Sequence, residues 1–154
     1  MADTELKKRL RIKAPVERVW GLIEAVERAP EWNPLLKTVI PRKNKGRGVG
    51  GTSDFEARLN GITVAGQHEV TAFRPNQEYA ARCTAGAFST LRVAVTGKFL
   101  LEKVNEKETD LTAILSVKVP KVIVPLVKLA PVQKMLKAGL NDALDNLGNI
   151  TAKK

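Results

Sequence analysis

Hydrophobic and polar residues alternate along most of the chain up to Val119, and a period of two predicts β-strands, whose successive side chains point to opposite faces. A first, edge-like strand is expected from Glu5 to Lys13, where apolar residues alternate with basic ones. Another strand is expected from Leu35 to Ile40, and five more follow between Gly50 and Val119. The pattern therefore predicts a first strand and a later meander of six.

Turn sequences separate these strands. Asn60-Gly61 is the strongest two-residue hairpin signal, Pro75-Asn76 is expected to turn the chain, and Gly86 is expected to break the next strand. Asn105 to Glu108 is read as a polar turn. The glycine-rich segment from Gly46 to Gly51 leads into a strand, whereas a phosphate-binding loop leads into a helix, so a hairpin connection is expected. A gating loop at a cavity mouth would have the same sequence.

The period changes to that of a helix in two places. Pro15 is well placed in the first turn of a helix that carries Val16, Val19, Trp20 and Ile23, and Pro30 and Pro34 then allow only a short second helical turn. After Pro120 the chain becomes helical to its end. Pro125 argues against one straight helix from Lys121, so Pro131 is expected to begin the regular helix. Its apolar stripe comprises Val132, Leu136, Leu140, Ala143, Leu147 and Ile150.

Length and composition suit one domain. The 154 residues, 44% of them hydrophobic, provide for a single core over residues 1–154. The single cysteine, Cys83, excludes an internal disulfide and fits a reducing compartment. The N-terminal residues lack the apolar region of a secretory signal, and the apolar stretch from Val119 to Ala130 is too short to span a membrane. We therefore expect a soluble cytoplasmic protein.

The formal charge of +10 is the strongest compositional bias. Such an excess attracts nucleic acids, anionic membrane surfaces or acidic ligands. The basic residues are spread along the chain, and no aromatic residue lies between them to stack a base. We therefore expect a solvated basic surface with no specific nucleic-acid site, and an anionic membrane surface remains a possible partner. The apolar segment 122–129 would cover a cavity mouth or bind a second subunit, so the protein is expected to be a monomer or a homodimer.

The chain resembles the START-like superfamily, in particular its polyketide cyclase/dehydrase and lipid transport (SRPBCC) branch. The resemblance covers nearly the whole chain and lies in the order of its elements, in Pro15 to Trp20, which opens the first helix, and in Glu31 to Pro34, which closes the helical pair. It implies an α+β helix-grip (Bet v 1-like) fold, in which a seven-stranded antiparallel sheet curves around a long C-terminal helix with a hydrophobic cavity between them. Trp20 and Trp32 match positions that pack the small helices, and they identify no reaction.

An apolar gap between the sheet and the last helix is the main candidate site. The predicted ligand-binding residues combine inward-facing apolar positions with two polar groups, His68 and Tyr79. They are Trp32, Phe55, Leu59, His68, Tyr79, Leu91, Val93, Leu115, Val117, Leu136, Leu140 and Ala143. Small inward residues, among them Ala57, Ala81, Ala113 and Gly139, favour some empty volume.

No catalytic set is predicted. His68 is the only histidine, and a core histidine with a satisfied hydrogen bond is the favoured interpretation over a ligand contact. Cys83 is expected to be a buried, unreactive thiol, although a Cys83–His68 pair is conceivable if their strands are neighbours. No metal site and no cofactor are expected, because ligating residues do not cluster.

Three functions follow from these features. The first is non-catalytic binding or transport of a hydrophobic small molecule such as a lipid, quinone, sterol or polyketide-like aromatic. The second is an aromatase/cyclase or related dehydratase that uses the same cavity. The third is a basic protein- or membrane-interaction module.

Overall fold

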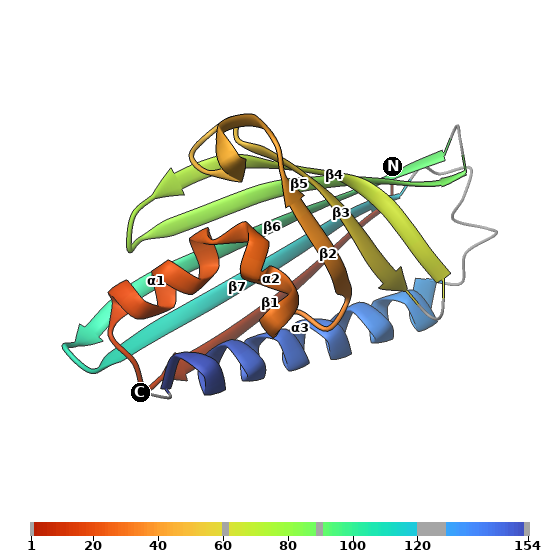
Figure 1. Cartoon of the computed structure of the whole chain (residues 1–154). Coiled ribbons are helices and arrows are strands. Elements are labelled where there is room, and N and C mark those ends of the chain that lie inside the picture. Colours follow the sequence, from red (N-terminus) through yellow and green to blue (C-terminus); the bar gives the residue numbers. More distant parts are fainter. Residues whose placement is uncertain (1, 60–61, 89–90, 120–128, 153–154) are drawn as a thin grey trace.

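Seven strands form one antiparallel sheet in the computed structural model, which describes residues 2–59, 62–88, 91–119 and 129–152 (Figure 1). The spatial order is β1-β7-β6-β5-β4-β3-β2, so the six strands after β1 form the predicted meander and β1 lies at an edge. The strands are β1 (Ala2–Ile12), β2 (Leu36–Pro41), β3 (Thr52–Leu59), β4 (Ile62–Arg74), β5 (Glu78–Phe88), β6 (Leu91–Asn105) and β7 (Glu108–Val119).

The helices lie on one face of this sheet (Figure 1). They are α1 (Val16–Glu24), the single 3-10 turn η1 (Val26–Arg28), the short α2 (Ala29–Trp32) and the long α3 (Leu129–Ala152); a second 3-10 turn, η2 (Lys43–Gly46), lies between β2 and β3. No helix in the described part of the chain is long and apolar enough to cross a membrane. The arrangement confirms the α+β helix-grip fold.

Prolines define where three of these helices begin. Pro15 immediately precedes α1, and Pro30 lies in the first turn of α2, where a missing backbone N–H costs no helical hydrogen bond. The long helix begins at Leu129, two residues before the predicted Pro131, which therefore also falls in a first turn. Residues 120–128, which include all of the apolar segment 122–129 except Leu129, lie outside the described residues.

One expected boundary is wrong. Gly86 does not break the strand, because β5 continues to Phe88 and the irregularity appears instead as a shift of register between Gly86 and Phe88. Glycine marks irregular pairing as readily as it marks a strand end, which explains the error. The turn at Asn76 is confirmed, with a positive φ of 63°. Asn60-Gly61 lies outside the described residues.

The register of the sheet gathers the apolar side chains on the inner face. Leu111 pairs with Leu10 on one side and with Leu101 on the other, and directly paired residues share a face. These side chains meet α1, α2 and the C-terminal half of α3, where Leu144 and Leu147 are fully buried. The packed core therefore lies at the end of the sheet that α1 and α2 cover.

Polar contacts fasten α3 to the two short helices. The guanidinium of Arg18 donates to the carbonyl oxygen of Thr151 at 3.1 Å, and the side-chain amide of Asn146 donates to the carbonyl oxygen of Trp32 at 3.2 Å. Both bonds join residues that are far apart in the sequence. They hold the C-terminal end of α3 in place against α1 and α2.

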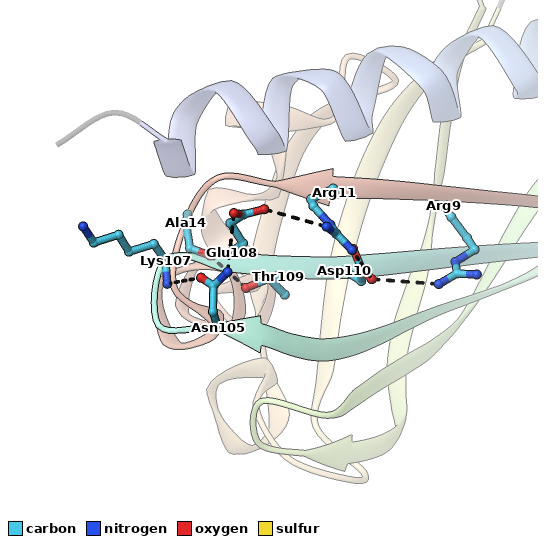
Figure 2. Close-up of polar contacts among 8 residues, drawn as sticks. All are labelled: Arg9, Arg11, Ala14, Asn105, Lys107, Glu108, Thr109 and Asp110. Atoms are coloured by element: carbon cyan, nitrogen blue, oxygen red, sulfur yellow. Dashed lines mark hydrogen bonds and ion pairs between the residues drawn. The ribbon is translucent and has the colours of Figure 1, made fainter.

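A second set of polar contacts fixes the sheet edge where β1 meets α1 (Figure 2). Buried Thr109 donates its hydroxyl to the carbonyl oxygen of Ala14 at 2.8 Å. Arg11 donates to both carboxylate oxygens of Asp110, at 2.8 and 3.2 Å, and Arg9 lies 3.9 Å from the same carboxylate. The bonding of Arg11 lowers the pKa of Asp110. Arg9 and Arg11, two of the basic residues, are therefore engaged in ordinary surface ion pairs.

Candidate functional site

The inner face of the sheet is packed at one end and partly open at the other. Near α1, the inner-face residues Val70, Ala81 and Ala113 are no more than 5% exposed. Farther along the same strands, five inner-face residues are only partly buried, although Val117 remains buried: His68, Cys83, Val95, Gly97 and Leu115. The small exposed fractions of Val70, Ala81 and Ala113 show that the backbone of an internal strand contributes little to the exposure of a residue. The greater exposure of these five residues is consistent with space on the inner side of the sheet.

Gly97 shows this space directly. It lies in β6 between Ala81 and Leu115, both on inner-face positions. A Cβ built at Gly97 meets no heavy atom of the described part of the chain within 4 Å, whereas one at Gly66 would lie 2.7 Å from the ring of Phe55. An inner-face position with open space above it is unusual, because protein interiors are packed closely. Gly97 therefore marks the floor of an unfilled space over the middle of the sheet.

Two polar side chains lie on the same inner face. His68 of β4 and Tyr79 of β5 have nearly parallel rings with centroids 6.4 Å apart. Tyr79 also packs edge-on against Trp20 of α1, at 6.2 Å, and against Phe73 of β4, at 6.4 Å. Within the described residues, neither the Tyr79 hydroxyl nor His68 Nδ1 has a hydrogen-bond partner, and both atoms are buried. The favoured expectation of a satisfied core histidine is therefore not met at Nδ1.

Burial keeps these groups uncharged. It lowers the pKa of His68 to about 4 and raises the pKa of Tyr79, to which the carboxylate of Glu24 adds. Cys83 lies directly opposite His68 across β4 and β5, as the conceivable pair required, but burial raises the pKa of its thiol to about 12. A neutral imidazole, a phenol and a thiol therefore share the site near neutral pH.

Some of the other predicted site residues are packed in the core, and others are only partly buried. Val117 and Ala143 are buried and no more than 4% exposed, and Ala143 belongs to the core cluster. Leu140 is partly buried beside that cluster, and Trp32 packs edge-on against Phe99 with centroids 5.8 Å apart. Four residues have described backbones only, in β3, β6 and α3: Leu59, Leu91, Val93 and Leu136.

Small inward residues did not all create space as expected. A Cβ at Gly139 would lie 2.7 Å from Leu35 Cδ1, so this glycine lets Leu35 pack closely on α3. Ala81 and Ala113 are packed in the core. The informative position, Gly97, was not singled out by the sequence reading. Its signal was a glycine inside a long apolar strand, which weakens a strand and marks a close approach by something else.

Two further features of the described residues concern metal binding and the outer face of the sheet. The described residues contain no group of three or more histidine, cysteine or acidic side chains placed to hold a metal ion. A polar hollow lies on β4 and β5 beside Gln67, Glu69, Arg82 and Thr84, whose alternation with inner-face residues puts them on the outer face. It therefore belongs to the opposite side of the sheet from the space above Gly97.

Comparisons with known proteins identify the family. A family model described as "Polyketide cyclase / dehydrase and lipid transport" matches residues 3–149. A search of curated protein sequences finds no match.

Solved structures show the same fold. A START superfamily protein from Mycobacterium smegmatis is 19% identical with a TM-score of 0.73, covering 96% of each chain. A conserved protein from Geobacillus kaustophilus is 18% identical with a TM-score of 0.77, covering 97% of this chain and 96% of that one. The Zhui aromatase/cyclase from Streptomyces sp. R1128 is 14% identical with a TM-score of 0.72, covering 98% and 92%. At these identities the likeness concerns the fold alone.

Proposed function

Because the chain belongs to the polyketide cyclase/dehydrase and lipid transport family of the START-like (SRPBCC) superfamily, we propose that it binds or transports a hydrophobic small molecule between the sheet and α3, without catalysing a reaction. The observation that carries this proposal is the open space above Gly97. Ligands of this class include lipids, quinones, sterols and polyketide-like aromatics.

The surroundings of Gly97 suit an apolar ligand. Val95, Phe99 and Leu115 are partly buried inner-face residues, and Leu140 of α3 is partly buried as well. Small-molecule sites are usually apolar spaces with few polar groups, and His68 and Tyr79 supply such groups here. Transfer of apolar ligand surface from water into this space provides the driving force.

An aromatase/cyclase remains the alternative in the same space. Such chemistry needs a group that exchanges a proton near neutral pH. The pKa of His68, about 4, makes it a weak base, while the raised pKa values of Tyr79 and Cys83 make them weak acids. These shifts support the non-catalytic proposal. Turnover of a linear polyketide analogue that is lost in His68→Asn would favour the enzyme instead.

The proposal is tested by filling the space. Gly97→Leu adds an isobutyl group at a position where a Cβ meets no described atom within 4 Å, so the group projects into the proposed ligand space. We expect this variant to bind the neutral fluorophore N-phenylnaphthylamine at least about tenfold more weakly, because ligand and side chain compete for the same volume. Fluorescence titration measures the affinity.

Thr96→Leu is the matched control. Thr96 is the neighbouring residue in β6 and is exposed on the outer face, so the same side chain added there leaves the space unchanged. Equal affinities of the Gly97→Leu and Thr96→Leu variants would contradict a ligand site above Gly97. Extraction of the purified protein with organic solvent, followed by mass spectrometry, then identifies any apolar molecule that it carries from cells.

Contact with an anionic membrane surface is a secondary part of the proposal. The connection between β2 and β3 exposes Val49, 64% accessible, among Lys43, Lys45 and Arg47. Exposed apolar and basic groups together favour anionic lipid surfaces. Co-sedimentation with phosphatidylserine vesicles should weaken as salt rises and in Lys43→Glu/Lys45→Glu, because screening and charge reversal remove the attraction.

A further inference from the structure

The unpaired polar atoms of His68 and Tyr79 set a requirement on the ligand. Both residues lie on the inner face, in neighbouring strands, and Tyr79 is 5% exposed. A buried hydroxyl without a partner destabilises a protein, and native structures contain few such groups. His68 as a whole is partly accessible although its Nδ1 is not, so another part of the residue reaches the surrounding space.

Among the described residues, the inner-face positions next to this pair hold no positive charge. The inner-face positions around it hold uncharged residues, namely Val70, Ala81, Cys83, Val95 and Phe99. The one carboxylate that acts on Tyr79 is Glu24, which is 3.7 Å from its own partner Arg47. The field at the Tyr79 hydroxyl therefore disfavours a further negative charge.

Lys8 is the nearest cation in the row of paired inner-face residues that contains Tyr79. It is too far from Tyr79 to neutralise a negative charge there. Lys8 pairs with Ala113, which pairs with Phe99, which pairs with Tyr79. Three strand spacings correspond to about 14 Å, and Lys8 Nζ already lies 4.0 Å from the carboxylate of Asp145. A carboxylate or phosphate beside Tyr79 would therefore be buried without a counter-charge.

We propose that His68 and Tyr79 form the polar end of the ligand site and select an apolar molecule that carries an uncharged hydroxyl or carbonyl group at that end. A neighbouring side chain must move aside to uncover the Tyr79 hydroxyl, which is buried in this structure. The phenol then donates a hydrogen bond to the ligand oxygen, and a ligand hydroxyl donates to the neutral imidazole. A phenol, an alcohol or a quinone meets this requirement. A fatty acid carboxylate or a lipid phosphate does not. This inference rests on the proposed function.

A set of ligands of one shape tests the selection. Naphthalene, β-naphthol and β-naphthoate share two fused rings and differ in having no polar group, a neutral hydroxyl or a carboxylate. Each is titrated against protein loaded with N-phenylnaphthylamine near neutral pH. We expect β-naphthol to bind about fivefold more tightly than naphthalene and at least about tenfold more tightly than β-naphthoate, from the gain of a hydrogen bond and the cost of an unpaired charge.

Hydroxyl deletion then assigns the effect to Tyr79. In Tyr79→Phe the ratio of β-naphthol to naphthalene affinity should fall toward one, and His68→Leu added to it should remove the remaining preference. Thr84→Val is the control, since it also removes one hydroxyl but from the outer face of β5, the strand that carries Tyr79. The ratio in Thr84→Val should equal that of the wild type.

Different outcomes separate the two proposals. If none of the three compounds displaces the fluorophore and the fluorophore itself does not bind, the proposed function is wrong and the inference is wrong with it. If naphthalene binds but β-naphthoate binds as tightly as β-naphthol, or if Tyr79→Phe leaves the preference intact, only the polar-end inference is overturned. Thermal unfolding establishes that each variant is folded.

Discussion

At the scale of single residues, the inner face combines apolar packing with buried polar atoms that have no partner within the described part of the chain, among them the Tyr79 hydroxyl and His68 Nδ1. Tyr79 is held between Trp20, Phe73 and His68, so its ring is well packed while its hydroxyl is not bonded. Packing thus fixes the hydroxyl in place at a cost in stability. Such a cost is typical of residues kept for binding.

Tyr79→Phe should therefore stabilise the ligand-free protein, in contrast to its effect on β-naphthol binding. Removal of an unbonded buried hydroxyl, with the ring retained, should raise the free energy of unfolding by about 1 kcal/mol. Urea denaturation without ligand measures it. A loss of stability of the same size would mean that the hydroxyl is bonded in the ligand-free protein.

His68 should make stability depend on pH. Its pKa is lowered from 6.5 to about 4 in the folded protein, so below pH 6.5 the unfolded chain binds the additional proton and the fold loses stability as pH falls. The loss should be about 2 kcal/mol between about pH 7 and about pH 5.

His68→Asn serves as the comparison in this pH series. Because the chain has one histidine, the variant should lose much less stability over the same range, as measured by urea denaturation. The lowered pKa of Asp110 and of Glu31 also reduces stability as pH falls, but at lower pH, where these carboxylates are protonated. Parallel pH curves for wild type and variant would show that His68 is not buried as a neutral ring.

At the scale of elements, two glycines give α3 different contacts with the sheet. A Cβ at Gly148 would lie 3.6 Å from Leu10 and 3.8 Å from Ile12, which are ordinary packing distances, whereas one at Gly139 would lie 2.7 Å from Leu35. The helix therefore has room for a methyl group at Gly148 but is in close contact at Gly139. This contact brings α3 against the residues that lead into β2.

Gly148→Ala should stabilise the protein by about 0.5–1 kcal/mol, because alanine favours a helix over glycine and no neighbour must move. Gly139→Ala should destabilise it by about 1 kcal/mol, since the gain in helix propensity is smaller than the cost of displacing Leu35. Both values come from urea denaturation.

In the Leu35→Ala background, Gly139→Ala should instead be stabilising, because the obstructing side chain is absent. A double-mutant cycle measures this coupling. The absence of coupling between positions 35 and 139 would rule out the close contact.

At the scale of the whole molecule, a packed core at one end supports a partly open space at the other. Residues of α1, α2 and the C-terminal half of α3 fill the first, and Gly97 lies under the second. Since the ligand would bind only the folded chain, its binding energy adds to the stability of the fold.

Saturating N-phenylnaphthylamine should therefore raise the unfolding temperature. At about a hundred times the dissociation constant the gain is about 2.7 kcal/mol, which corresponds to about 5–10 °C for a chain of this size. Gly97→Leu should show no such shift, while Thr96→Leu should keep it. Differential scanning calorimetry measures both, and an equal shift in the two variants would place the ligand elsewhere.

The sequence determined the order of the elements because that information is local. The alternation of apolar and polar residues predicted the strands and placed His68 and Tyr79 on the inner face. The prolines in the first helical turns predicted where the helices begin to within a residue or two. With the resemblance in Pro15 to Trp20 and Glu31 to Pro34, it also gave the helix-grip fold and the family.

Only the tertiary structure decided which inward positions are packed and which are open. Ala81, Gly139 and Gly97 are all small, yet the first lies in the core, the second receives Leu35, and only the third has open space above it. The pairing of His68 with Cys83 and the stacking of its ring near Tyr79 depend on register across separate strands. The alternation along a strand determines toward which face of the sheet a residue points. Whether the space above that face is occupied depends on side chains from distant parts of the chain.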